Sequence, residues 1–377
     1  MTSAKVLPVL ERIRSKNLHT WLGAWLVDAA GKALRPPPRG LRHLLFAVCD
    51  HYEPLVAGAG PVQGRERVRA WSEGYERALG RFRDADGRPP RHTWFFPGEQ
   101  YAPEFVEPLG TLARAGMGEV EVHLHHDGDT AATLRQKLEL ALADLERHGL
   151  VSRDATGRPR WAFIHGNWCL ANSRRDGRWC GVDEELPLLF EAGCYADLTF
   201  PSAPDQSQPG IVNRIYWPTG DLSRRRAHHQ GTRARVGQVF DDRLLMIQGA
   251  IAPSWRPGRS RLRIESSALQ AGDPPTLARL DTWVAQDVHV EGRPEWTFVK
   301  VHAHGALERN AASLLGSEGQ AFHADLAARY NDGRRWALHY VTAREMYNIA
   351  MAAMQGASGD PSAFRDHLVP PPPAAAR

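Results

Sequence analysis

In four widely spaced segments of the chain, histidines follow an apolar, strand-like run. In two of these segments, acidic residues follow the run as well. Their sequences are LLFAVCDHYEP (44–54), EVEVHLHHDGDT (119–130), WAFIHGNW (161–168) and FVKVHAHG (298–305). Imidazoles and carboxylates are costly to bury without partners, so four such endings indicate a shared metal or acid–base site. Parallel barrels collect their working groups at the carboxyl ends of their strands. The pattern therefore predicts one polar site at the mouth of a barrel.

The run HLHHDGD (123–129) has the residue types of a divalent-metal site. His123 and His125 would point to the same face of an extended strand. Once the chain turns, Asp127 or Asp129 could converge with them. Two imidazoles and a carboxylate suit zinc and similar ions. The alternative is a polar loop whose histidines are hydrogen-bonded and whose Asp caps the next helix.

Asp50 would emerge at the carboxyl end of another buried strand. His51 and Glu53 are close enough to share that site, whereas Cys49 is expected to be a buried strand residue. In the alternative interpretation, Asp50 caps the turn and Glu53 is solvated. We expect one divalent ion, zinc, with ligands drawn from Asp50, His51, His123, His125 and Asp127.

His302 and His304 alternate on one face of the last of the four runs. Either could act as a general acid, because imidazole titrates near neutral pH. Either could instead be a metal ligand or a hydrogen-bonded core histidine. Polar groups and a flat apolar ring that would suit a sugar are also expected at this mouth. These candidates for substrate binding are His165, Asn167, Trp168 and Glu99; the alternative is a buried Trp with polar neighbours.

The composition indicates a large globular protein. Its 377 residues are 42% hydrophobic and include twelve Trp, which is ample material for a core. The basic stretch RRRAHHQGTRAR (224–235) could bind an anion or be a solvated loop. It contains no interleaved aromatic residues, so it does not indicate a nucleic-acid partner. The N-terminus lacks the apolar core of a signal peptide, and no run is long enough for stable membrane insertion. The four Cys form no CxxC pair, so we expect a reduced, cytoplasmic protein.

Strand-like and helix-like segments alternate through the chain, which predicts parallel βαβ units. Strands are expected at 44–49, 92–98, 119–125, 161–164, 196–200, 214–217, 244–247 and 297–301. Helices are expected at 65–83, 103–115, 130–148, 183–192, 275–286, 318–330 and 342–354. The number of strands favours an α/β barrel over an open sheet. Residues 1–40 would be an N-terminal appendage, in which WLGAWLV (21–27) docks as a helix or strand. Residues 41–356 would form the barrel with C-terminal helices, and 357–377 a disordered Pro/Ala-rich tail.

By motif order over residues 41–305, the chain resembles the polysaccharide deacetylase superfamily, which has the NodB-homology fold of family-four carbohydrate esterases. The resemblance implies a distorted (β/α) barrel. It also implies a first strand that ends in Asp-Asp, a base and a metal ligand, and a later His-x-x-x-His pair that completes the metal site. A late strand supplies a catalytic His. The corresponding segments here are Cys49-Asp50-His51, then EVEVHLHHDGD, IHGNW and VHAHG.

The chain departs from that pattern in three places. The Asp-Asp pair is either Cys49-Asp50, with Asp50 as ligand and no base, or Asp50-His51, with Asp50 as base and His51 as ligand. The His-x-x-x-His pair falls on His123 and Asp127 or on His125 and Asp129, so its second His is an Asp. The family's arginine loop has no clear match, and IHGNW takes its place.

The resemblance implies a metal-dependent hydrolase that removes an acetyl group from an N-acetylated, less often O-acetylated, sugar or polysaccharide precursor. Asp50 or Asp127 would accept a proton from water, and His302 or His304 would protonate the departing amine. One alternative is a non-catalytic binding or assembly component of polysaccharide synthesis, for which the missing Asp-Asp pair argues. Another is a different metal-assisted hydrolase, such as a phosphoesterase, in which residues 224–235 contact the anion.

Overall fold

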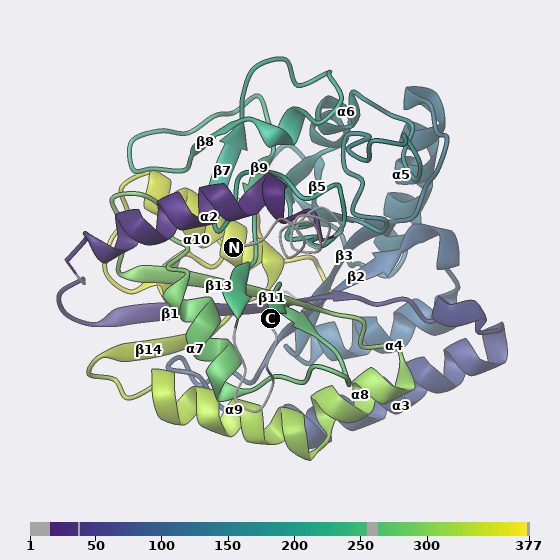
Figure 1. The fold of residues 1–377 in the computed structure, drawn as a ribbon. Helices are drawn as coiled ribbons and strands as arrows, with labels where there is room; N and C mark the ends of the chain where they lie inside the picture. The colour runs from purple at the N-terminus through teal and green to yellow at the C-terminus, as the bar shows by residue number, and fades with distance from the viewer. Residues whose placement is uncertain (1–15, 37, 255–262, 375–377) are drawn as a thin grey trace, which may run out of the picture.

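The computed structural model describes residues 16–36, 38–254 and 263–374, which form a mixed α/β fold around a mostly parallel twelve-stranded sheet (Figure 1). The main path runs through β12 (Ala268–Leu269), β13 (Trp296–Ala303), β1 (Arg42–His51), β2 (His92–Pro97), β3 (Gly118–Leu124), β5 (Pro159–His165), β6 (Cys194–Asp197), β9 (Leu245–Ile247), β7 (Ile215–Pro218) and β8 (Gly231–Arg233). Off this path, β14 (Trp336–Tyr340) pairs with β1, and β4 (Ser152–Arg153) pairs with β5. A separate hairpin contains β10 (Ala252–Ser254) and β11 (Arg263–Glu265).

Helices surround the sheet, and they include every helix that the sequence predicts. They are α2 (Leu18–Ala33), α3 (Pro61–Leu79), α4 (Pro103–Arg114), α5 (Ala131–Glu146), α6 (Glu185–Glu191), α7 (Leu277–Ala285), α8 (Glu308–Leu315), α9 (Ser317–Tyr330) and α10 (Ala343–Met354). Short 3₁₀ turns occur at η1 (Val56–Gly58), η2 (Gly98–Gln100), η3 (Ala227–His229) and η4 (Pro361–Phe364). Thr130 is the N-cap of α5, because its side chain accepts a hydrogen bond from the Thr133 N–H.

The sheet is not closed, which differs from the barrel that the sequence predicts. Its far end is antiparallel, since β7 runs against β9 and β8 runs against β7. An irregular segment fills the space between β8 and β13 in place of a strand. Within it, the Glu291 N–H donates to the Ala234 carbonyl, and the Val288 carbonyl accepts from the Phe298 N–H. These isolated hydrogen bonds bridge the gap without forming a ladder.

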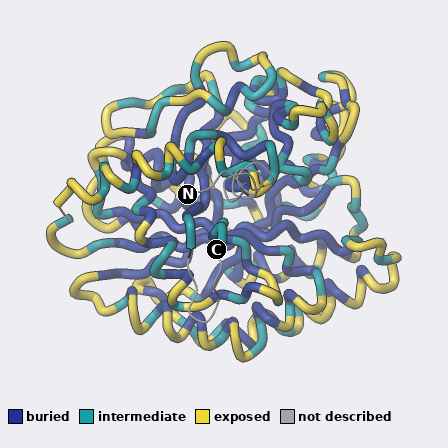
Figure 2. Tube along the Cα trace, in the orientation of Figure 1, coloured by how far each residue is buried: buried dark blue, intermediate teal, exposed yellow. Residues whose placement is uncertain are grey.

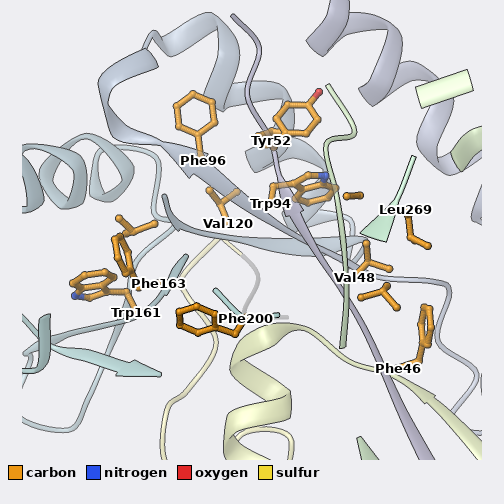
Figure 3. Close-up of a cluster of buried hydrophobic side chains, with 14 of the residues drawn as sticks. Phe46, Val48, Tyr52, Trp94, Phe96, Val120, Trp161, Phe163, Phe200 and Leu269 are labelled. Atoms are coloured by element: carbon orange, nitrogen blue, oxygen red, sulfur yellow. The ribbon is translucent and has the colours of Figure 1, made fainter. Parts of the chain in front are cut away.

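The long strand β1 separates two parts of the hydrophobic core. Leu44, Phe46 and Val48 pack in one cluster with residues of α3 and α9, part of which Figure 3 shows. Leu45 and Cys49 pack in the other cluster with residues of α10. Successive side chains of a strand point to opposite faces, so Asp50 and His51 also face opposite sides of β1. In Figure 2 the strands are almost entirely buried, and exposed residues are concentrated on the outer helices and loops.

Helix α10 is buried on every side, since all of its 12 residues are buried. Its polar residues are paired: Arg344 bonds Glu119, and Asn348 donates to the Arg365 and Val369 carbonyls. The segment after α10 therefore packs against the helix, whereas the sequence predicts a disordered tail. Arg365 is 2% exposed and bonds Glu345 at 2.9 Å, and these buried contacts order a stretch whose composition resembles a linker. Residues 375–377 of the predicted tail lie outside the described residues.

The described part of the predicted appendage contains a docked helix, α2. Trp21 is 0% exposed and packs against Ala203, Val212 and Ile251, which confirms that the WLGAWLV segment docks on the body of the protein. The first fifteen residues of the appendage lie outside the described residues. Among the helices in the described ranges, none has both the length and the apolar character of a membrane span.

Candidate metal centre

The carboxyl ends of β1, β3, β5 and β13 meet at one edge of the sheet, as predicted for parallel strands. Strand β13 pairs with β1 so that Cys49 lies opposite His302. On the other side, β3 pairs with β5 so that Leu124 lies opposite His165. These registers bring the histidine-rich ends of the four strands together.

The Glu53 carboxylate lies at the centre of the resulting cluster. Its Oε1 is 3.3 Å from His123 Nε2, 3.5 Å from His125 Nε2 and 4.0 Å from His304 Nε2. The Glu53 side chain is only 8% exposed. One buried carboxylate oxygen therefore faces three imidazole nitrogens that come from two other segments of the chain.

His51, the last residue of β1, completes this cluster. Its ring centroid is 4.8 Å from those of both His123 and His304. Neither ring nitrogen of His51 has a hydrogen-bond partner among the described residues, although the residue is 1% exposed. Ligand atoms of His51, Glu53 and His123 all lie within 4.8 Å of one another. Buried polar atoms without partners are costly, so the two His51 nitrogens are available to bind a ligand.

The tautomers of two histidines add a second reason to expect a cation. The His123 Nδ1 lies 2.9 Å from the Ile164 carbonyl, which can only accept, so Nδ1 carries the proton. The His125 Nδ1 is held in the same way by the Glu99 carboxylate at 2.6 Å. In a neutral ring each Nε2 then presents a lone pair to the Glu53 carboxylate. Acceptors that face each other this closely require a proton or a metal ion between them.

The spacing of the nitrogen and oxygen atoms fits a metal ion. Two ligand atoms that are each about 2.1 Å from one zinc ion, at a tetrahedral angle, lie about 3.4 Å apart. The separations of 3.3 and 3.5 Å from Glu53 to His123 and His125 match this value. The hydrogen bonds from the Nδ1 atoms to Ile164 and Glu99 are typical of the outer partners that orient metal-binding imidazoles.

The electrostatics of the cluster favour an ionised Glu53 carboxylate, neutral His51 and His304 rings and a protonated His125 ring. Burial would raise the pKa of Glu53, but the contacts with the His123 and His125 rings outweigh burial and hold that pKa well below its usual range. Burial, followed by the neighbouring His304, lowers the pKa of His51 well below its ordinary value. Burial also lowers the pKa of His304. For His125, burial is outweighed by the contacts with Glu53 and Glu99, which raise its pKa to about 9.

The structure does not bring Asp50 into this cluster, although the sequence predicts it as ligand and base. Its Oδ1 accepts a 2.6 Å hydrogen bond from the Gly305 N–H, and its Oδ2 lies 3.9 Å from His92 Nε2. Gly305 lacks the Cβ that would stand 2.2 Å from Asp50 Oδ2. Burial raises the pKa of Asp50 to about 7. Of the two registers considered, the geometry matches the one in which His51 is the ligand.

Asp127 also lies apart from the cluster. It is exposed, and its Oδ1 accepts a 2.6 Å hydrogen bond from the Trp179 N–H. Glu53 supplies the carboxylate of the cluster, whereas the sequence predicts that Asp50 or Asp127 supplies it. It stands two residues after His51, just beyond the end of β1, and this short spacing is the signal that could have identified it as a ligand.

The two late-strand histidines differ in access to solvent. The His304 side chain is 30% exposed at the edge of the cluster. His302 is 6% exposed, its Nδ1 has no partner among the described residues, and its ring centroid is 5.9 Å from that of His51. His304 is therefore the better placed of the two to meet a substrate.

The predicted substrate-binding residues separate into different roles. Trp168 borders the cluster, with its ring centroid 6.4 Å from that of His51. Glu99 holds His125, and the Asn167 amide donates to the His126 carbonyl at 3.4 Å. His165 is 0% exposed and belongs to a second buried group described below.

The basic stretch 224–235 lies partly against the loop that follows β5. The Arg225 Nε donates to the Asn172 carbonyl at 2.5 Å, and the Arg226 Nε donates to the Ser173 carbonyl at 2.7 Å. These two arginines support the backbone of the loop, so the stretch gives little support to the phosphoester alternative.

Comparison with known proteins yields no relative: no protein-family model matches the chain, and no curated protein matches it. The resemblance to the polysaccharide deacetylase superfamily therefore stays a prediction.

Proposed function

We propose that the protein is a metal-dependent hydrolase that binds one divalent ion, zinc, through His51, Glu53, His123 and His125. The observation that carries the proposal is the buried Glu53 oxygen, which faces the Nε2 atoms of His123 and His125 beside a His51 ring that has no hydrogen-bond partner among the described residues. A divalent ion would satisfy all of these atoms at once.

An ion bound here would polarise a carbonyl oxygen and lower the pKa of a water molecule. The groups of the chain that would handle protons lie on the open side of the cluster. Neutral His304, whose pKa is lowered by burial, can accept the proton of the attacking water and then donate it to the departing amine. Glu99 orients His125 through its Nδ1. Trp168 offers a flat apolar surface beside His51, which suits the face of a sugar ring.

The substrate class that we propose is an N-acetylated sugar, with an O-acetylated sugar as the less favoured substrate. This part of the proposal rests on the order of the motifs over residues 41–305 and on the Trp168 surface. The position of Asp50 on the other face of β1 leaves His304 as the proton-transferring group in this scheme.

The experiment pairs metal content with acetate release. Protein purified without chelator should hold a divalent ion and release acetate from N-acetylated sugars. His304→Ala should keep the ion and lose about 100- to 10,000-fold in rate, as expected when a positioned general base or acid is removed. His367→Ala is the matched control, because His367 is exposed and its side chain bonds Gln355, far along the chain from the cluster.

Three results would contradict parts of the proposal. Failure to retain or load any ion would favour a binding or assembly component. Metal without acetate from any acetylated sugar would reject the substrate class. Unchanged turnover in His304→Ala would remove His304 from the mechanism.

A further inference from the structure

A second buried group of metal-binding side chains lies where β5 and the loop after it meet α6. It contains two histidines, a thiol and a carboxylate, all with exposures of 3% or less: His126, His165, Cys180 and Glu185. One ligand atom from each lies within 4.8 Å of the others. We propose that these four residues bind a second, structural zinc ion.

The Glu185 carboxylate connects the group. Its Oε1 is 3.2 Å from His126 Nε2 and 3.9 Å from His165 Nε2, and its Oε2 is 3.4 Å from Cys180 Sγ. Around a tetrahedral zinc ion with bonds of about 2.1 Å to N or O and 2.3 Å to S, neighbouring ligand atoms lie about 3.4–3.6 Å apart. The observed distances scatter around these values.

The surroundings of two ligands are those of a metal site. The His126 Nδ1, opposite the nitrogen that faces Glu185, lies 3.2 Å from Asp129 Oδ2. Asp129 is itself bonded by Lys137 at 2.7 Å, so a carboxylate is fixed behind the imidazole. The Asn172 backbone N–H donates to Cys180 Sγ at 3.3 Å, a contact that would stabilise a thiolate.

His165 points an unpaired nitrogen into the group, because its fully buried Nε2 has no hydrogen-bond partner among the described residues. Its Nδ1 accepts a 3.2 Å hydrogen bond from the Asn167 N–H, so a neutral His165 carries its proton on Nε2. Binding through Nε2 therefore requires the other tautomer and the loss of this long hydrogen bond. One such bond is a small loss beside the metal–ligand bonds that replace it.

The position of the group explains what the ion would do. Its ligands come from four segments: the turn after β3, the end of β5, the loop 166–184 and the first turn of α6. The loop contains no helix or strand among its residues, and long loops of this kind need another source of order. All four ligands are buried and one of them is a cysteine, a ligand set typical of structural zinc sites. It would fix the loop that carries Trp168 against the first centre.

The experiment uses the sulfur ligand, because the first centre contains no cysteine. X-ray absorption at the zinc edge of the zinc-loaded protein should show a sulfur scatterer at about 2.3 Å. The parent should hold two ions per chain, and Cys180→Ser should hold one, without the sulfur signal. Cys169→Ser is the matched control and should behave like the parent: Cys169 is also buried in this loop, but its Sγ donates to the Asn167 carbonyl at 2.8 Å.

The parent protein alone can decide the question if Cys180→Ser fails to fold. Zinc-loaded parent without sulfur scattering would overturn the proposal and leave a buried His126–Glu185 ion pair. Glu53→Gln separates the two centres: it should weaken the first site and keep the sulfur-bound ion. A sulfur signal with only one ion per chain would support this second site and contradict the first.

Discussion

Raising the pH from 6 to 8 should strengthen metal binding at the first centre by about 100-fold. Burial disfavours a charged His125, but Glu53 and Glu99 outweigh burial and raise its pKa to about 9. A metal ion can bind Nε2 only after this proton has left. With a pKa of about 9, the deprotonated fraction is about 0.1% at pH 6 and about 10% at pH 8, which gives the factor of about 100.

The other two ligands with shifted pKa values add little to this dependence. The pKa of His51 is well below its ordinary value because of burial, so this ring is already neutral at pH 6. The pKa of Glu53 is also well below its usual range, because the contacts with the His123 and His125 rings outweigh burial, so the carboxylate is already ionised. His125 should therefore dominate the rise in affinity with pH.

The assay is competition with a chromophoric chelator in a non-coordinating buffer at pH 6, 7 and 8. Glu99→Gln removes one of the carboxylates that raise the pKa of His125, so its affinity should rise less steeply with pH. Loss of this orienting partner should also weaken binding by about 10- to 100-fold, so the slopes are compared rather than the absolute affinities. Glu104→Gln is the control, because Glu104 is exposed and its carboxylate pairs with the exposed Arg65. A parent affinity that stays constant from pH 6 to 8 would refute the place of His125 among the ligands.

Two further predictions concern stability. Burial lowers the pKa of His323 to about 3, so the folded state excludes a proton that the unfolded chain binds below pH 6.5. The free energy of unfolding of the parent should therefore fall by about 2 kcal/mol between pH 7 and pH 5 because of this residue. In denaturant titrations, the free energy of unfolding of His323→Phe should fall correspondingly less. In Gly305→Ala, the new Cβ would lie 2.2 Å from Asp50 Oδ2 and 2.7 Å from Trp71, so the free energy of unfolding should fall by about 1–3 kcal/mol. Gly23→Ala, where nothing lies within 4 Å, should not destabilise; equal effects of the two glycine variants would contradict the packing described here.

The sequence predicts the alternating elements well because apolar periodicity is local. The strands that end in His51, Leu124 and His165 and the helices that follow β1 and β3 are found near their predicted bounds. Whether the sheet closes into a barrel could not be predicted from the sequence, because this depends on how residues 288–291 bridge β8 and β13. The packing of Arg365 beside α10 is likewise a long-range contact that composition does not reveal.

The parts of the candidate site that follow from the alternation of side chains along a strand could be predicted from the sequence. The shared face of His123 and His125 is a period-two pattern, and in the structure both rings lie near Glu53. The register of Asp50 and His51 could not be settled from the sequence, because either could face the site until the partner strands are known. The group around Cys180 depends on the path of the irregular loop 166–184, for which no local rule exists.

The central claim is that one divalent ion is bound by His51, Glu53, His123 and His125. Anomalous diffraction at the zinc edge from crystals grown with zinc tests it most directly. The account predicts a peak about 2.0–2.2 Å from the Glu53 carboxylate and from the Nε2 atoms of His123 and His125, with a nitrogen of His51 at the same distance. Zinc peaks only at surface positions, with the His51 ring still without a partner, would contradict it.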